Sequence, residues 1–361
     1  MKVILKRKEL INALNSVSRL TSIRSTLPIL QNVYFGAENN ELIIRATNLE
    51  QTVESVIEAE VTESGTITIP LRLFLDSLQN NTDEIVTISS DDLSILIKSS
   101  NHQVKLKGLA AEDYPTSQKV DVDFEFNIDQ QELNKAVNHC IFATALDDTR
   151  PILTGLLFKF IDKKLVIVGT DGYRLAKYEV SNIEGKGEFI VPKKTLLELQ
   201  KLLDNGNTVV SVGQNQIQFK VNKKVLISRL IDGNYPAFES IIPKIKTLEV
   251  SGAGTSLLNS LKMASLFSRE SSYSTQLSVE GSRLKLLAKS PHTGESQSEV
   301  AVENSSKNNF EVSLNAQYLI DVLSVYSGEF KIEFNTQGSP VVLRFLDEDN
   351  YMYLVMPLRN D

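Results

Sequence analysis

Residues 171–174 read Asp-Gly-Tyr-Arg and bring together a carboxylate, a glycine and a guanidinium, the combination best suited to chemistry in this 361-residue chain. Two further acids, Asp147 and Asp148, could act with Asp171 as the general acid and base of a hydrolase. The alternative is structural, with Asp171 capping a turn and Gly172 supplying a positive φ. The turn is favoured, because no repeat-equivalent position offers the acids a partner.

Other catalytic and metal-binding patterns are weak. The phosphate-binding glycine patterns, the GxSxG elbow and HExxH are all missing in a usable context. The single cysteine, Cys140, and the three histidines, His102, His139 and His292, have no zinc-ligand spacing. Cys140 is interpreted as a small core residue and His139 as a packed or solvent-facing one. We therefore expect no catalytic residues, no metal and no cofactor.

The composition is that of a globular protein, with 42% hydrophobic and 23% charged residues. The length allows two or three domains that each bury a core. One cysteine excludes an internal disulfide framework, and no apolar run approaches the roughly 18 residues that cross a bilayer. We expect a cytoplasmic protein. The net charge of −7 argues against a general DNA-coating protein but leaves a locally basic surface possible.

Several segments recur at nearly constant spacing. ThrLeuProIleLeu at 26–30 returns as ThrArgProIleLeu at 149–153, 123 residues later, and AspTyrPro at 113–115 returns as AsnTyrPro at 234–236, 121 residues later. Such internal repeats indicate a fold built from like units. We predict three domains of about 120 residues, at 1–122, 123–247 and 248–361.

Hydrophobic periodicity changes in the same order within each repeat. Apolar residues at three- and four-residue spacing predict a first helix at 8–20, 130–143 and 256–267. Alternating strands follow, and a second helix is predicted to open after Pro70, Pro192 and Ser313. Each repeat is thus an α+β unit with two helices packed on antiparallel sheet.

Charge is distributed unevenly between the predicted helices and the rest of the chain. The helical segments hold 13 Lys and Arg against 8 Asp and Glu, whereas the remainder holds 25 against 37. One interpretation is that the helices are simply solvated and lysine-rich. The other is a positive surface for a polyanion backbone in an otherwise acidic protein.

The C-terminal segment 353–359, TyrLeuValMetProLeuArg, is strongly apolar. It can form the last strand of a domain. Alternatively, Met356 beside Pro357 can line an apolar pocket that adapts to different partners. The sequence leaves both open.

The threefold repeat, the motifs at 26–30, 170–176 and 232–236, and the C-terminal segment together resemble the bacterial DNA sliding clamp family, the beta subunit of the replicative DNA polymerase III. The resemblance implies a non-catalytic processivity factor that forms a head-to-tail homodimer, a ring of six like domains around duplex DNA. It also implies partners: the replicative polymerase, a separate ATP-dependent clamp loader, and other replication and repair proteins.

The resemblance further implies three sets of functional residues. A peptide-binding pocket between the second and third domains would comprise Leu153, Thr170, Gly172, Tyr173, Arg174, Leu175, Pro236, Ser240, Ile241, Leu354, Val355, Met356 and Pro357. DNA contacts would come from the loop residues Arg24 and Arg150, with Lys6, Lys193 and Lys201 added from their helical location. The ring seam would join Val104 and Leu106 of one subunit to Leu266 and Phe267 of the next.

Three features depart from the family pattern. Tyr173 stands where histidine is common, Ser240 stands where arginine is common, and Asn360-Asp361 extend beyond the usual ending. We expect a shifted peptide preference. Two other classes remain as alternatives: a three-domain scaffold that binds peptides without encircling DNA, and the hydrolase using Asp147, Asp148 and Asp171.

Overall fold

The computed structural model describes residues 1–21, 27–115, 119–147, 149–304 and 308–358. The chain divides into two compact units, of which unit 1 comprises Met1–Gln131 and Lys194–Leu230, and unit 2 comprises Glu132–Lys193 and Ile231–Asp361. The α-helices of the described residues are α1 (Arg7–Val17), α2 (Leu71–Gln79), α3 (Gln130–Ile141), α4 (Lys193–Leu202), α5 (Gly254–Ser268) and α6 (Ala316–Val325). None of the described helices is long and apolar enough to span a membrane.

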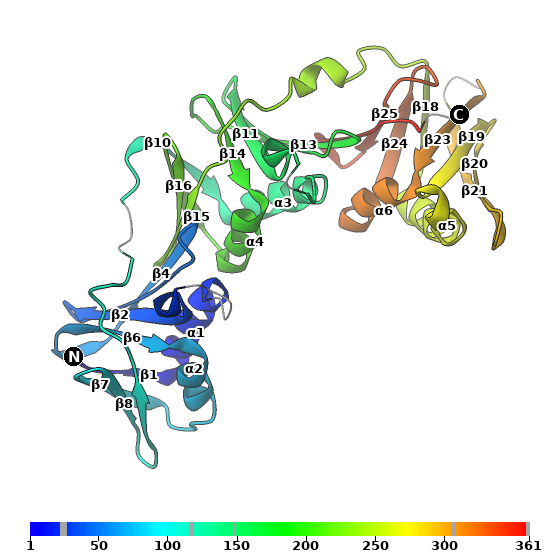
Figure 1. The fold of residues 1–361 in the computed structure, drawn as a ribbon. Helices are drawn as coiled ribbons and strands as arrows, with labels where there is room; N and C mark the ends of the chain where they lie inside the picture. The colour runs from blue at the N-terminus through cyan, green and yellow to red at the C-terminus, as the bar shows by residue number, and fades with distance from the viewer. Residues whose placement is uncertain (22–26, 116–118, 148, 305–307, 359–361) are drawn as a thin grey trace. The chain divides into compact units, whose positions relative to one another are not determined.

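Unit 1 contains two antiparallel sheets with helices packed on them (Figure 1). In the described residues, the larger sheet has the order β10 (Val122–Asp129), β15 (Asn207–Gly213), β16 (Gln216–Val221), β17 (Lys224–Arg229), β4 (Gln51–Glu58), β3 (Glu41–Thr47), β2 (Asn32–Glu38), β6 (Gly65–Pro70). The smaller has the order β5 (Glu60–Glu63), β1 (Lys2–Lys6), β7 (Ile85–Asp91), β8 (Ser94–Lys98), β9 (Gln103–Lys107).

Unit 2 has the same plan. Its larger sheet has the order β14 (Glu188–Pro192), β11 (Gly155–Ile161), β12 (Lys164–Thr170), β13 (Arg174–Ser181), β26 (Glu348–Val355), β25 (Val341–Phe345), β24 (Glu329–Phe334), β18 (Leu248–Ala253), β22 (Glu303–Asn304) among the described residues. Its smaller sheet has the order β21 (Gly294–Ala301), β20 (Arg283–Ser290), β19 (Ser274–Glu280), β23 (Phe310–Asn315).

Each large sheet is shared by two repeats. In unit 1, β4 of the first repeat pairs with β17 of the second, and Ser55 lies opposite Lys224. In unit 2, β13 of the second repeat pairs with β26 of the third, and Tyr178 lies opposite Tyr351. We call these pairings the first and second junctions. Because backbone hydrogen bonds run through them without interruption, each junction is as regular as the sheet inside a repeat.

The core follows from the predicted periodicities. Helix α1 buries Leu10, Ala13, Leu14 and Val17, one stripe at helical spacing, against β3 and β4. The strands place alternate residues inside, as in β4, where Gln51, Val53 and Ser55 are buried. Cys140 is buried on α3, and burial raises the pKa of its thiol, so the expectation of an inert core cysteine is confirmed.

The repeat is confirmed at the level of single residues. Strands β2, β3 and β4 have the same bounds as β11, β12 and β13 when 123 is added to each residue number. The hairpin turns match too, since Asn39 and Asn40, like Asp162 and Lys163, have positive φ. Two consecutive residues with positive φ form the two-residue turn whose twist suits a hairpin.

The second helices predicted to open after Pro70 and Pro192 are confirmed. Pro70 and Pro192 are the last residues of β6 and β14, so each helix starts one residue after its proline. Ser313 is wrong as a helix cap, because it lies within β23. Asn315 caps α6 instead, and its side chain accepts bonds from the backbone N–H groups of Gln317 and Tyr318. The domain boundaries at 122 and 247 stay a prediction, since the middle repeat contributes to both units.

Candidate functional site: a polar cavity at the second junction

The turn between β12 and β13 is held by its own side chains. Asp171 Oδ1 accepts the backbone N–H groups of Tyr173 (2.9 Å) and Arg174 (3.1 Å). Thr170 Oγ1 accepts the N–H of Gly172 at 3.1 Å, and Gly172 has φ of +92°, which other residues rarely adopt. The turn predicted for residues 171–174 is confirmed.

The turn directs the Arg174 guanidinium into the interior of unit 2, where only 7% of the residue is exposed. Its Nε donates to Asp171 Oδ2 at 2.9 Å, and its Nη2 donates to the Phe142 carbonyl at 2.8 Å. Its Nη1 forms an ion pair with Asp321 of α6, and the group lies 4.5 Å from the Tyr318 ring centroid. Burial alone lowers the pKa of Arg174, but the surrounding acidic groups outweigh burial and raise it.

A cavity of about 360 Å³ opens beside this arginine. Its wall combines the segment after α3, the β12–β13 turn and one residue of α6: Thr144, Ala145, Leu146, Asp147, Thr149, Arg150, Leu153, Asp171, Tyr173, Arg174 and Tyr318. Leu146 and Tyr173 are 89% and 63% exposed, so the rim offers apolar surface to a binding partner.

An apolar cluster lies under the turn. Leu153 and Leu175 pack there with Leu354, all three buried, and Met356 packs against the cluster while half-buried. The Met356 backbone N–H donates to the Tyr173 carbonyl at 2.9 Å, which continues the β13–β26 pairing past the strand end. Of the two interpretations of the C-terminal segment, β26 confirms the last strand, while Met356 lies next to the turn.

The predicted pocket residues therefore fall into three groups. Leu153, Tyr173 and Arg174 line the cavity. Five others belong to the turn or to the strands beneath it: Thr170, Gly172, Leu175, Leu354 and Val355. The rest are exposed or half-buried residues of the segments around η4 (Phe238–Ile241) and after β26: Pro236, Ser240, Ile241, Met356 and Pro357. Asn360 and Asp361 lie outside the described residues.

Two residues that contact Arg174, of which Tyr318 also lines the cavity, were missed by sequence reasoning. Tyr318 and Asp321 lie on α6, 144 and 147 residues from Arg174, and no local pattern links them to the turn. The hydrolase residues were singled out but are not arranged for catalysis. Both Asp171 oxygens accept hydrogen bonds within the turn, Asp147 is exposed and bonded to Thr149, and Asp148 lies outside the described residues.

At the first junction, the position equivalent to Arg174 lies at the start of β4. Gln51, 123 residues before Arg174, donates from Nε2 to Thr195 Oγ1 at 2.8 Å, and Thr195 is 123 residues before Tyr318. Ser228 Oγ lies 2.6 Å from the same hydroxyl. Short neutral side chains close this position with buried hydrogen bonds, whereas the arginine and tyrosine at the second junction border a cavity.

The predicted DNA-contact residues are scattered. Lys6 and Lys201 are exposed and pair with Glu9 and Glu198, at 3.2 and 2.8 Å. The helical location predicted for Lys6 is wrong, because Lys6 is the last residue of β1 and α1 begins at Arg7. Arg150 is exposed and lines the cavity. Lys193 is half-buried, and burial together with the Arg174 charge lowers its pKa. Arg24 lies outside the described residues.

Two of the predicted seam residues lie on an edge strand of unit 1, and the other two lie on a helix of unit 2. Val104 and Leu106 are half-buried on β9, an edge strand of unit 1. On α5 of unit 2, Leu266 is 61% exposed and Phe267 is half-buried. No group of three or more His, Cys, Asp or Glu side chains in the described chain is arranged to hold a metal ion.

The fold and the repeat define a class, a protein of three α+β clamp domains. Family models of the DNA polymerase III beta subunit match in order, with the N-terminal domain at residues 1–118, the central domain at 127–237 and the C-terminal domain at 239–359. The chain belongs to this family, the beta sliding clamps, whose members are non-catalytic processivity factors. The predicted family, fold class and lack of catalysis are confirmed.

Individual relatives agree along the whole chain. The beta sliding clamp of Pseudomonas putida is 31% identical over 369 residues, covering 99% of this chain and all of the relative. The crystal structure of the DNA polymerase III subunit beta from Pseudomonas aeruginosa is 29% identical, with a TM-score of 0.96 over 100% of both chains. A Pseudomonas aeruginosa sliding clamp bound to griselimycin has a TM-score of 0.95 at 29% identity, again over both full chains.

Proposed function

We propose that two copies of this chain close head to tail into a ring around duplex DNA. The ring tethers the replicative polymerase and other replication and repair proteins through the cavity at the second junction, and an ATP-dependent loader opens it. Membership of the beta sliding clamp family supports this role. Tethering needs no catalysis, because it raises the local concentration of polymerase at the primer end.

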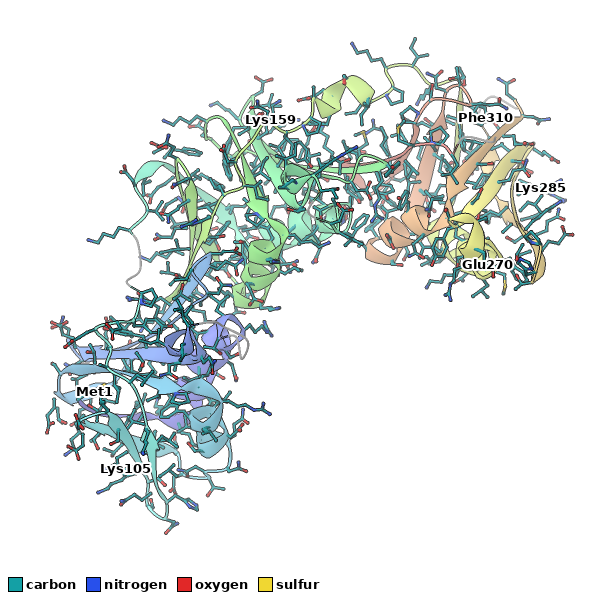
Figure 2. All side chains as sticks on the ribbon, viewed as in Figure 1. Met1, Lys105, Lys159, Glu270, Lys285 and Phe310 are labelled. Carbon is teal, nitrogen blue, oxygen red and sulfur yellow. The ribbon has the colours of Figure 1, made fainter. Side chains whose placement is uncertain are left out.

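The observation that carries the proposal is the charge of two unpaired sheet edges. On β9, an edge strand of unit 1, Lys105 and Lys107 are exposed; Figure 2 labels Lys105. On β21, an edge strand of unit 2, Glu295 and Glu299 are exposed. They pair with Lys289 and Arg283 of β20 in exposed ion pairs, which are weak and can exchange for a partner's lysines. One chain therefore carries a basic edge and an acidic edge, which is what a heterologous contact between identical copies requires.

Apolar side chains accompany the charged edges. Helix α5 packs on β20 and β21, so exposed Leu266 and half-buried Phe267 accompany the acidic edge strand. On the basic edge, Val104 and Leu106 keep part of their surface exposed between the lysines. An apolar centre with a charged rim is the usual composition of a stable interface.

The cavity supports partner binding. Its wall combines exposed apolar side chains with a guanidinium held rigid by Asp171 and Asp321. A rigid polar group within an apolar rim suits a short peptide with an apolar anchor. Because Leu146 and Tyr173 are exposed at the rim, we expect this cavity to take an apolar or aromatic anchor.

DNA contact rests on the net positive charge of the helical segments and on sequence-independent attraction to phosphate. Among the predicted residues, Arg150 is exposed, while Lys6 and Lys201 form ion pairs with the nearby Glu9 and Glu198. Exposed ion pairs of this kind are weak, so a phosphate can displace the glutamate.

The test is sedimentation equilibrium of the wild-type chain and of the double variant Leu266→Lys, Phe267→Lys. Wild type should sediment at twice the monomer mass of 40.2 kDa and stay on closed circular DNA, but slide off the linearised form. The variant places two charges in the apolar seam and should be a monomer that circular DNA does not retain. A monomeric wild type would favour the scaffold alternative, and a dimeric double variant would refute the seam.

A further inference from the structure

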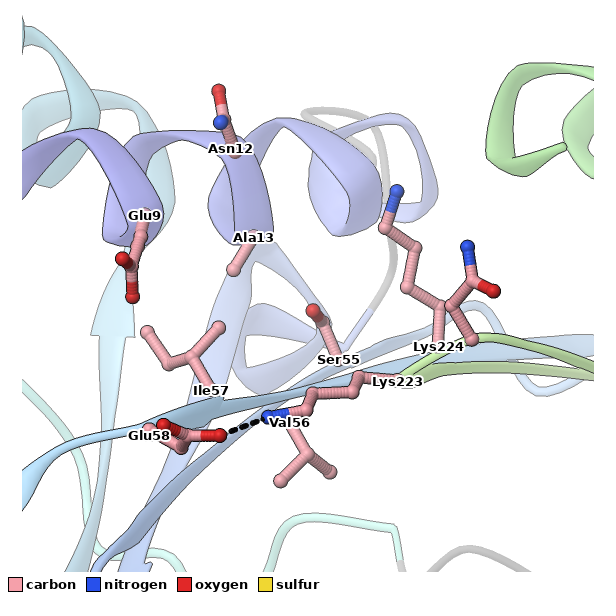
Figure 3. Close-up of a pocket in the computed structure, with 10 residues that line it drawn as sticks. Glu9, Asn12, Ala13, Ser55, Val56, Ile57, Glu58, Lys223 and Lys224 are labelled. Carbon is pink, nitrogen blue, oxygen red and sulfur yellow. Dashed lines mark hydrogen bonds and ion pairs between the residues drawn. The ribbon is translucent and has the colours of Figure 1, made fainter. Parts of the chain in front are cut away.

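A second cavity, of about 400 Å³, lies in unit 1 between α1 and the first junction (Figure 3). Helix α1 contributes Glu9 and Ala13, β4 contributes Ser55 and Ile57, the β16–β17 turn contributes Lys223, and β17 contributes Lys224. None of its lining residues belongs to the candidate peptide site.

The equivalent place in unit 2 can be identified residue by residue. Adding 123 converts β4 into β13 and Glu9, Ala13 and Ser55 into Glu132, Ala136 and Tyr178. The strand opposite follows from the register, since Lys224 faces Ser55 as Tyr351 faces Tyr178. The side chains that surround this position can therefore be compared between the two units, residue by residue.

In unit 2 this place is filled by a tyrosine ring. The Tyr178 hydroxyl donates to Glu132 Oε1 at 3.1 Å. The Lys135 ammonium lies 5.9 Å from the centroid of the Tyr178 ring, and the His139 ring lies 5.3 Å from it. Tyr351 closes the far side, with its ring centroid 6.2 Å from that of Tyr178. Tyr178 is fully buried.

In unit 1 the equivalent positions have no aromatic rings, but the carboxylate that accepts the hydroxyl in unit 2 has a counterpart. Serines stand where Tyr178 and His139 stand, at Ser55 and Ser16, and Lys224 replaces Tyr351. Glu9 keeps the place of Glu132 on the helix, and Ala13 keeps the small surface that lets a ring approach. Glu9 accepts a bond from Lys6 at Oε1, on its exposed side. The cavity is thus the space left by a missing phenol, with a carboxylate at the position of the hydroxyl acceptor.

We propose that the cavity of unit 1 binds a phenol ring, the chemistry of a tyrosine side chain, with the hydroxyl donating to Glu9. Ala13 and Ile57 contact the ring faces, and the Lys224 side chain covers it much as Tyr351 covers Tyr178. The Glu58–Lys223 ion pair, drawn in Figure 3, lies along the cavity wall.

The probe is p-cresol, with toluene as the matched ring without the hydroxyl, followed by ligand-observed NMR on the full chain. For a ligand of this size we expect a dissociation constant on the order of 1 mM. Toluene should bind about tenfold more weakly, because it leaves Glu9 without a donor. N-acetyl-tyrosinamide is the second arm: if it binds as well as p-cresol, a tyrosine of a partner protein fits, and if only p-cresol binds, the ligand is a free phenol.

Two variants test the position. Ser55→Tyr should abolish p-cresol binding, because its own ring fills the cavity as Tyr178 does in unit 2. Glu9→Leu, at a half-exposed helix position, should weaken p-cresol about tenfold and leave toluene unchanged, and Glu50→Leu, an exposed acid outside the cavity, should change neither. Equal binding of p-cresol and toluene, or wild-type p-cresol binding in Glu9→Leu, would overturn the proposal.

Discussion

At the scale of single residues, two tyrosines make the same bond in two repeats. The Tyr114 hydroxyl lies 3.3 Å from the Arg45 carbonyl, and the Tyr235 hydroxyl lies 3.3 Å from the Val168 carbonyl. Val168 is the residue 123 positions after Arg45, so the recurring TyrPro motif marks a common anchor. In each case a buried hydroxyl ties the segment after the last strand of a repeat back to its central sheet.

Tyr114→Phe tests this anchor through its pH dependence. Burial raises the pKa of Tyr114 to about 12, from about 10 in an unfolded chain. The neutral hydroxyl is favoured in the folded state, so its stabilisation is complete below pH 10 and is lost as pH rises from 10 to 12. That loss is roughly 3 kcal/mol. The variant should be about 1 kcal/mol less stable at pH 8 but lose less stability by pH 11, as urea unfolding at both values would show. Equal losses in the two proteins would contradict the anchor.

The residues of the candidate site were only partly predictable. Asp171 and Gly172 could be recognised because turn chemistry is local. Tyr318 and Asp321 could not, because their contact with Arg174 depends on how α6 packs against β13. The pocket and DNA residues taken from the family resemblance stay predictions, and Arg150, predicted to contact DNA, also lines the cavity.

At the scale of elements, β26 supports two strands at once. Leu354 pairs with Leu175 of β13 and with Val342 of β25, and it is fully buried. The apolar C-terminal segment is thus an interior strand of the large sheet in unit 2. Any change there affects both the second and the third repeat.

Deleting residues 354–361 should destabilise unit 2 by at least about 4 kcal/mol, because it removes two buried side chains from the sheet interior. Calorimetry should show a clear fall in the melting temperature. Truncation after Pro357 is the control, because among described contacts it removes only the bond from the Leu358 N–H to the Ser313 carbonyl. Similar melting of both truncations would show that β26 carries little of the stability. Loss of partner binding after the longer deletion would therefore say nothing specific about the cavity.

The elements themselves were largely predictable because their patterns are local. Apolar spacing placed α1, α3 and α5 to within a few residues, and the strands expected after each of these helices are present. The helix start at α6 was wrong because a serine inside a strand resembles a cap, and only the backbone register shows that the strand continues to Asn315. The joining of β4 to β17 is a long-range pairing that the sequence alone does not specify.

At the scale of the whole molecule, head-to-tail closure makes a prediction that two-fold closure does not. One variant reverses the basic edge, Lys105→Glu with Lys107→Glu, and another reverses the acidic edge, Glu295→Lys with Glu299→Lys. Each alone should dimerise at least tenfold more weakly, because both of its seams bring like charges together. Mixed, they should form a heterodimer with one wild-type seam and one doubly reversed seam, both complementary.

Sedimentation velocity of the two variants, separately and mixed, measures this rescue. Lys220→Glu, on an interior strand of the large sheet, is the control for a change in net charge and should dimerise like wild type. A mixture that remains monomeric while each variant is folded would exclude pairing of β9 with β21.

The identical bounds of β2–β4 and β11–β13 have an evolutionary consequence. The two repeats now share few side chains, yet the segment from α1 to the end of β4 has kept its length to the residue against the segment from α3 to the end of β13. An inserted residue would move every following side chain of a strand to the opposite face of the sheet, whereas a substitution alters one side chain. Between these two repeats, drift after duplication has therefore changed composition and kept length, whereas the third repeat, from α5 to the end of β21, is shorter, at Gly254–Ala301 against Gln130–Ser181. An insertion scan of the first two repeats should find these segments far less tolerant than a substitution scan does.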